Sequence, residues 1–111
     1  MIEQKTAAEV YELIKDQGKK NLIDVRTPEE FAEVHASDAV NIPLDTFVGN
    51  SANVEEILKD INKDETVYII CRSGARSMKA AEICQEAGFS SLVNVSGGTI
   101  EWVDSGLPIV K

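Results

Sequence analysis

The segment 66–70, with the sequence TVYII, predicts a central strand of a parallel sheet. Four of its five residues are β-branched, and a continuous run of this kind is typical of a strand that is buried on both faces. Such a strand needs helices on either side of the sheet to cover it. We therefore expect the rest of the sequence to supply further strands and the helices that connect them.

Short apolar runs and helical segments alternate along the whole chain. Thr6 and Glu9 match a capping box, and Thr27 is a predicted N-cap followed by Pro28 at the first helical position. Strands are predicted at residues 2–5, 22–25, 39–42, 66–70 and 91–95, helices at 7–17, 28–31, 54–61, 77–87 and 99–104, and an irregular connection at 44–53. This order predicts one α/β domain over residues 1–111, with a mostly parallel central sheet of about five strands and helices on both faces.

Charge and cysteine content exclude several classes of protein. The 111-residue chain has a net charge of −8, so nucleic acid and anionic membranes are unfavourable partners. No apolar run approaches the roughly 18 residues that a membrane-spanning helix needs. With one histidine and two cysteines thirteen positions apart, the sequence predicts no metal site, no cofactor and no disulfide framework. We expect a cytoplasmic protein with reduced thiols.

Three predicted strands end in residues that are unusual for simple loops. These strand ends are Asp24-Val25-Arg26, Cys71-Arg72-Ser73 and Ser96-Gly97-Gly98. Parallel strands share a direction, and ligands bind at the carboxyl ends of such sheets. The three segments are therefore predicted to meet at one edge of the sheet and to form a site there.

The segment CRSGARS, residues 71–77, has the composition of an anion-binding loop. Its small residues allow the chain to curl into a helix N-terminus, where several backbone N–H groups point at one spot. A cysteine in this position, near Arg72 and Arg76, can have its pKa lowered from about 8.5 to roughly 3.5–7.5. A buried structural cysteine would not need adjacent arginines, so Cys71 is the predicted nucleophile. Cys84, which shares a helical face with alanines, is predicted to be a packed core residue.

Three motifs resemble those of a single-domain rhodanese, and they occur in the order of that family: LIDVRTPEEFAEVHASDAVNIP at residues 22–43, then CRSGARS, then NVSGGTIEW. The resemblance implies a sulfurtransferase in which Cys71 accepts a sulfur atom as a persulfide. It also implies that backbone amides of the loop hold the transferred sulfur. The implied substrate-binding residues are therefore Arg72, Ser73, Gly74, Ala75, Arg76 and Ser77. The family commonly has Gly-His followed by a Pro-Gly turn where this chain has VHASD at 34–38, and Ser-Asp can still form a turn.

Two other functions remain open at this point. A phosphatase or arsenate reductase uses a similar cysteine loop, but its pattern has five residues between the cysteine and the arginine, and here four separate Cys71 from Arg76. A shorter loop forms a smaller cup, and CRSGAR contains no general acid for an alkoxide leaving group. A non-catalytic rhodanese-like binding module is the second alternative, although such modules often lack the cysteine.

Asp24 and Arg26 are predicted to support the site, and His35 is not. Asp24 could accept N–H bonds from neighbouring loops, while Arg26 could pair with Glu30 or help to bind an anion. His35 is interpreted as structural, because a low-pKa thiolate needs no base. The resemblance further implies a small anionic sulfur donor such as thiosulfate, a polysulfide or a persulfide. The implied acceptors are cyanide, a thiol such as glutathione or thioredoxin, or a sulfur-carrier protein.

Overall fold

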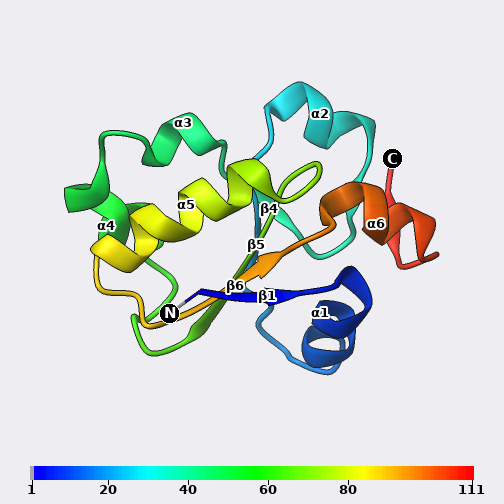
Figure 1. Ribbon diagram of the computed structural model, residues 1–111, viewed down its shortest axis with the longest axis horizontal. Coiled ribbons are helices and arrows are strands. Elements are labelled where there is room, and N and C mark those ends of the chain that lie inside the picture. The colour runs from blue at the N-terminus through cyan, green and yellow to red at the C-terminus, as the bar shows by residue number, and fades with distance from the viewer. Residues whose placement is uncertain (1) are drawn as a thin grey trace.

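The computed structural model describes residues 2–111, and Met1, the first residue of the predicted domain, lies outside this range. Its centre is a parallel five-stranded sheet with the strand order β1-β6-β5-β2-β4 (Figure 1). These strands are β1 (Ile2–Lys5), β2 (Leu22–Asp24), β4 (Val40–Asn41), β5 (Thr66–Ile70) and β6 (Ser91–Val95). The predicted α/β class, the parallel sheet of five strands and the central place of β5 are confirmed.

Strand β5 is buried on both faces, as its sequence predicts. Val67 and Ile69 point into one hydrophobic cluster, whereas Tyr68 and Ile70 point into the other. Cys71 continues the first set and belongs to the cluster on the side of Val67. The two-residue period of the strand thus fixes the face of the sheet from which Cys71 projects.

Helices cover both faces of the sheet. They are α1 (Ala7–Ile14), α2 (Pro28–Glu33), α3 (Leu44–Phe47), α4 (Val54–Ile57), α5 (Ala75–Glu86) and α6 (Gly98–Asp104), with a 3-10 turn at Ser51–Asn53. Helices α1 and α6 contribute Val10 and Trp102 to one cluster, and α3, α4 and α5 contribute Phe47, Val54 and Ala80 to the other. No helix within residues 2–111 is long and apolar enough to cross a lipid bilayer.

The two helix starts for which the sequence predicts a cap, at Thr6 and Thr27, both carry that cap. The Thr6 side chain accepts a bond from the backbone of Glu9, and the Glu9 carboxylate accepts one from Thr6 in return. Thr27 and Glu30 form the same reciprocal pair at the start of α2, with Pro28 as its first residue. These local signals therefore mark the starts of α1 and α2 in the sequence itself.

The remaining element bounds differ from the sequence predictions in several places. Helix α1 ends at Ile14 rather than near Gly18, because the polar residues 15–17 give it no further apolar face. Helix α4 is shorter than predicted, α2 extends to Glu33, and α5 begins at Ala75 rather than Ser77. The connection predicted to be irregular contains α3 and the 3-10 turn.

Two further strands were not predicted. Strands β3 (His35–Ala36) and β7 (Ile109–Val110) pair antiparallel in a separate two-stranded sheet. Strands of two residues are too short to show a hydrophobic period. The turn at Ser37 and Asp38, where this chain departs from the common family pattern, closes with a bond from the Ala39 amide to the Ala36 carbonyl at 3.0 Å.

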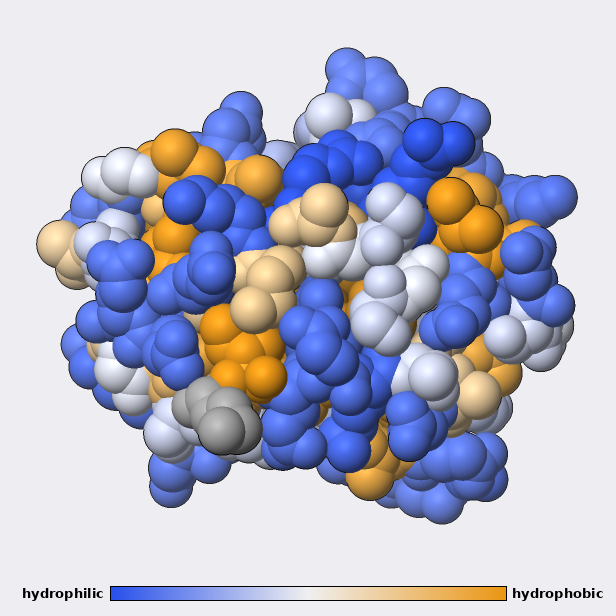
Figure 2. All heavy atoms as spheres, in the orientation of Figure 1, coloured by the Kyte–Doolittle hydropathy of each residue, from blue (hydrophilic) through white to orange (hydrophobic). Residues whose placement is uncertain are grey.

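Polar side chains dominate the face of the molecule seen in Figure 2, and the apolar atoms there form separate patches. Large apolar side chains that stay exposed include Val40 on the edge strand β4, Val48 after α3, and Ile100 and Val103 on α6. Ile100 and Val103 line one cavity beside the carboxyl ends of the strands, where the predicted site lies, and Val48 lines another.

Candidate active site

The three strand ends singled out in the sequence lie side by side at the carboxyl edge of the sheet. The amide of Val25, just after β2, donates to the carbonyl of Ile70 at 3.0 Å. On the other side, the amide of Thr99 donates to the carbonyl of Cys71 at 2.8 Å, and the Thr99 hydroxyl donates to the same oxygen at 2.9 Å. The backbone of Ile70 and Cys71 is therefore held between the segments that follow β2 and β6.

Two glycines allow these segments to approach one another so closely. Gly74, the N-cap of α5, has φ 105°, and an added Cβ would collide with the carbonyl oxygen of Ser96. Gly98 has φ 62°, and a Cβ there would collide with the carbonyl oxygens of Cys71 and Arg72. A side chain at either position would force the Cys71 loop and the loop after β6 apart.

Hydrogen-bond donors surround the sulfur of Cys71. The amide of Gly74 donates to Sγ at 3.0 Å, and the hydroxyl of Ser77 lies 3.3 Å from Sγ. Cys71 is only 1% exposed, and this burial raises the pKa of its thiol. The Ser77 hydroxyl and the backbone amides of Ser77, Gly74 and Ser73 lower the pKa by more, so the net pKa lies below its ordinary value. The curled, amide-lined loop predicted from CRSGARS is present.

The two arginines of the loop are in different environments. The guanidinium of Arg76 forms two parallel bonds with the Glu30 carboxylate of α2, Nη1 to Oε1 at 2.7 Å and Nη2 to Oε2 at 2.9 Å. Arg76 lowers the pKa of Glu30 to about 2, and Glu30 in turn raises the pKa of Arg76. Arg72 is exposed and lines a cavity beside the loop. Arg72 therefore presents its charge to solvent, while Glu30 neutralises much of the charge of Arg76.

Asp24 and Arg26 form a buried ion pair behind the loop. Their side chains are 0% and 5% exposed, and Nη2 of Arg26 lies 2.8 Å from Oδ2 of Asp24. Asp24 Oδ1 also accepts from the backbone amide of Arg26 at 2.9 Å, so its carboxylate bonds to its own loop rather than to the neighbouring loops that were predicted. The expected pairing of Arg26 with the Glu30 carboxylate is wrong. Besides Asp24, Arg26 donates to the backbone carbonyls of Glu30 at 3.3 Å and Val34 at 2.6 Å. It does not bind the Glu30 carboxylate, because its charge is already paired with that of Asp24.

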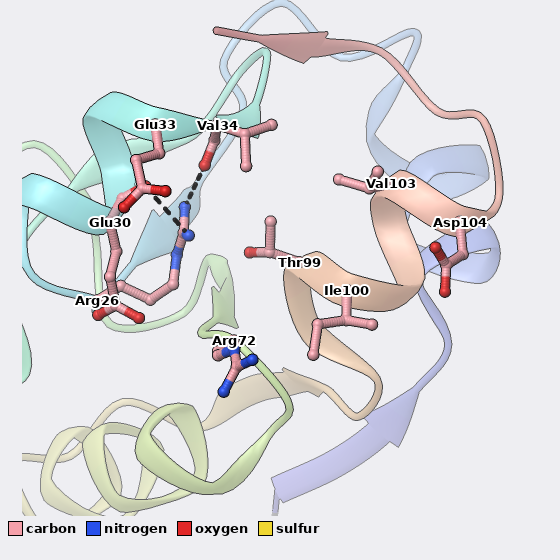
Figure 3. Close-up of a pocket in the computed structure, with 9 residues that line it drawn as sticks. All are labelled: Arg26, Glu30, Glu33, Val34, Arg72, Thr99, Ile100, Val103 and Asp104. Carbon is pink, nitrogen blue, oxygen red and sulfur yellow. Dashed lines mark hydrogen bonds between the residues drawn. The ribbon is translucent and has the colours of Figure 1, made fainter.

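Two cavities flank the Cys71 loop. One of about 380 Å³ lies on the side of Arg72, with Arg26, Glu33 and Val34 on one wall and α6 on the other (Figure 3). The wall from α6 presents Thr99, Ile100, Val103 and Asp104. The other cavity, of about 580 Å³, lies on the side of Arg76, between the start of α2 and α3. Small molecules or a partner side chain can thus approach the loop from two sides.

The sequence model of the family described as Rhodanese-like domain matches residues 6–105. The chain belongs to the rhodanese-like domain family. It is 38% identical over 89 residues to a sulfurtransferase of Allochromatium vinosum, which covers 80% of this chain and 77% of that protein. It is 36% identical over 91 residues to thiosulfate sulfurtransferase 16, chloroplastic, of Arabidopsis thaliana, covering 78% and 76% of the two chains. The crystal structure of a rhodanese-like domain protein from Staphylococcus aureus superposes with a TM-score of 0.75 at 33% identity, over 98% of this chain and 99% of that one.

Two residues of this rhodanese-like domain have roles beside the site that the sequence did not predict. Glu30 was expected as a possible partner of Arg26, yet its carboxylate holds Arg76, which lies 46 positions away. Asn94 of β6 lies against the Ser77 hydroxyl through its Oδ1 atom. The signal for Asn94 in the sequence is a polar residue between the apolar residues of the run LVNV, and in the structure its side chain is buried, with 3% exposure.

The other predicted residues lie as follows. Ser73 and Ala75 are exposed at the rim of the loop. His35 stacks on Phe31 with ring centroids 3.6 Å apart, and its Nδ1 lies 2.6 Å from the Phe31 carbonyl oxygen, which supports the structural interpretation. Cys84 is fully buried, and burial raises the pKa of its thiol to about 12.

Proposed function

We propose that this rhodanese-like domain is a sulfurtransferase that carries a sulfane sulfur atom as a persulfide on Cys71. The observation that supports the proposal is the set of donors around Sγ, namely the Gly74 amide at 3.0 Å and the Ser77 hydroxyl at 3.3 Å. Hydrogen bonds that favour the thiolate over the thiol produce a nucleophile without a separate general base.

The proposed first step is attack of the Cys71 thiolate on the outer sulfur of the donor. With thiosulfate, a new S–S bond forms at Cys71, the donor S–S bond breaks, and sulfite leaves with the bonding electron pair. Sulfite is weakly basic, so its departure needs no proton donor, and CRSGAR contains no acid to supply one. The product on the enzyme is a persulfide anion.

The loop is the proposed binding site for the outer sulfur of that persulfide. The amides of Arg72 to Ser77 surround the start of α5, where the positive end of the helix dipole favours an anion. The exposed Arg72 adds a charge that attracts an anionic donor from the neighbouring cavity. Asp24 and Arg26 hold the loop after β2 in place behind the site.

In the second step, an acceptor attacks the outer sulfur and regenerates the Cys71 thiolate. Cyanide gives thiocyanate, and a thiol such as glutathione or thioredoxin, or a sulfur-carrier protein, becomes a persulfide. Both cysteines are free, which suits a reducing compartment, and we place the reaction in the cytoplasm.

The test is steady-state formation of thiocyanate from cyanide with thiosulfate, polysulfide and glutathione persulfide as alternative donors. We expect turnover with at least one of them, and loss of turnover in Cys71→Ser. Hydrolysis of an aryl phosphate at a comparable rate, without sulfur transfer, would instead support the phosphatase alternative. Absence of both activities from folded protein would favour a binding module.

A further inference from the structure

The hydroxyl of Ser77 lies between two groups that compete for its single proton. On one side it is 3.3 Å from Cys71 Sγ, and on the other it donates to Asn94 Oδ1. Ser77 is fully buried and Asn94 is 3% exposed, so water does not readily replace either contact. A hydroxyl has one proton to donate, and it cannot satisfy both acceptors at once.

The orientation of the Asn94 amide is set by its other contacts. Its Nδ2 atom donates to the backbone carbonyl of Gly74 at 3.2 Å and to Oε1 of Gln4 at 2.8 Å. A backbone carbonyl can only accept, so Nδ2 must face Gly74 and Oδ1 must face Ser77. Rotating the amide would place two acceptors, Oδ1 and the Gly74 carbonyl, against each other.

We propose that Asn94 is a positioning residue of the sulfur-transfer site, which competes with Cys71 for the hydroxyl proton of Ser77. In the thiol form, Cys71 S–H donates to Ser77 Oγ and Ser77 donates to Asn94 Oδ1, so every group in the row has a partner. In the thiolate form, the thiol proton has gone to solvent and Ser77 turns its own proton to Sγ. Asn94 Oδ1 then loses its hydrogen bond from the Ser77 hydroxyl, which is its donor among residues 2–111.

This competition bears on the chemistry because it opposes ionisation of the nucleophile. The donors of the loop favour the thiolate, while Asn94 holds one of those donors back. When the persulfide forms, Sγ carries no negative charge and Ser77 can return its proton to Asn94. The inference rests on the proposed role of Cys71 as the nucleophile, and it adds a group that adjusts how much thiolate is present before each transfer.

The test measures the pH midpoint of Cys71 alkylation by iodoacetamide in the wild type and in four variants of the full chain. Ser77→Ala removes a donor and should raise the midpoint by about one pH unit. Asn94→Leu, which is close in shape but has no acceptor, should lower the midpoint. In the double variant, Asn94→Leu should cause no further change, because its effect runs through Ser77. Gln4→Leu is the matched control, since it removes the other partner of Asn94 Nδ2 without touching Ser77, and its midpoint should match the wild type.

The charged groups around Cys71 stay the same in all these variants. They are Arg72 of the loop, Arg76 of α5 with its partner Glu30 of α2, and the Asp24–Arg26 pair after β2. A midpoint that is unchanged or raised in Asn94→Leu would overturn the proposal. An equal fall with and without Ser77 would also overturn it, because Asn94 would then act by another route.

A measurement on the wild type covers the case in which Asn94→Leu does not fold. The side-chain amide resonances of Asn94, followed by NMR as the pH rises, should shift with the same midpoint as Cys71 alkylation. The shift should be absent in Ser77→Ala, and its absence in the wild type would contradict the competition. Neither readout requires sulfur transfer. If the proposed function were wrong, the wild type would form no thiocyanate, while the effects of the variants on the pH midpoint of Cys71 alkylation could still be measured.

Discussion

Cys71 and Cys84 are similar in burial but opposite in chemistry. They are 1% and 0% exposed, and both belong to the same hydrophobic cluster. The pKa of Cys71 is nevertheless lowered, whereas that of Cys84 is raised to about 12. Burial raises the pKa of both thiols, so burial cannot be the cause of the difference.

The two ends of helix α5 account for the contrast. Cys71 lies before the first turn, where backbone N–H groups have no partner within the helix and can donate to its sulfur. Cys84 lies in the last turns, where the N–H groups are already bonded along the helix, and burial is the cause that raises the pKa of its thiol. In this chain the difference between the two thiol pKa values is thus due to the hydrogen-bond donors around Cys71, the Ser77 hydroxyl and the backbone amides, and not to exposure.

The largest expected effect separates the two cysteines by activity. Cys71→Ser should reduce sulfur transfer at least about a thousandfold, because a serine hydroxyl cannot form the persulfide. Cys84→Ala should leave kcat within about twofold and cost only on the order of 1 kcal/mol of stability, since it removes one buried sulfur atom. Thiocyanate formation and thermal unfolding measure these outcomes. Equal losses of activity in the two variants would break the comparison.

The next effect separates them by reactivity in the folded protein. Iodoacetamide at pH 7 should alkylate Cys71 at least about a hundredfold faster than Cys84, since the thiolate fraction of Cys84 is negligible at a pKa of about 12. As the pH rises, the alkylation rate of Cys71 should rise with a midpoint below the ordinary thiol value, because the pKa of Cys71 is lowered. Mass mapping of the labelled peptides distinguishes the sites, and denatured protein, in which both should react alike, is the control.

Gly74→Ala sharpens the comparison by disturbing the donors of Cys71 alone. The new Cβ meets the Ser96 carbonyl and also requires φ 105°, so we expect a stability loss of about 2–4 kcal/mol and about a tenfold fall in kcat/KM. Gly106→Ala is the matched control, because Gly106 also has positive φ, at 72°, but open space where the Cβ would be. It should cost only about 1 kcal/mol and leave transfer unchanged. Chemical denaturation and donor kinetics report both, and equal effects of the two substitutions would contradict the role of Gly74.

The smallest expected effect concerns charge near the start of α5. Glu30→Gln keeps a side chain that can cap α2 but releases Arg76, so the KM for dianionic thiosulfate should fall by a few-fold while that for a less charged persulfide changes less. A KM for thiosulfate that stays the same would show that Arg76 already acts unhindered by Glu30.

The same variant has a signature in the pH dependence of stability. The pKa of Glu30 is lowered to about 2 in the folded protein, so its contribution is present above the ordinary value of 4.5 and is lost as the pH falls towards 2. Because the pair is about one-third exposed, we expect about 1 kcal/mol. Wild-type stability should therefore drop more steeply than that of Glu30→Gln over this range, as measured by denaturation at a series of pH values.

The sequence was sufficient for those features that arise from local patterns. The β-branched run of β5, the two capping boxes and the segment CRSGARS each specify their own structure, and parallel topology then brings the three strand ends together. Glu30 and Asn94 could not be placed in this way, because their partners Arg76 and Ser77 lie 46 and 17 positions away. The pairs form only once α2 and β6 are packed against α5. The strands β3 and β7 were missed because two residues carry no period.

The central claim is that the donors at the start of α5 make Cys71, and not the equally buried Cys84, the sulfur carrier. Mass spectrometry of the intact protein and its peptides after treatment with thiosulfate, polysulfide and glutathione persulfide tests this claim most directly. We predict that at least one donor adds one sulfur atom to the peptide that contains Cys71, that cyanide removes it, and that Cys71→Ser gains none. Sulfur added to Cys84 instead, or no gain from any donor by the folded protein, would contradict the account.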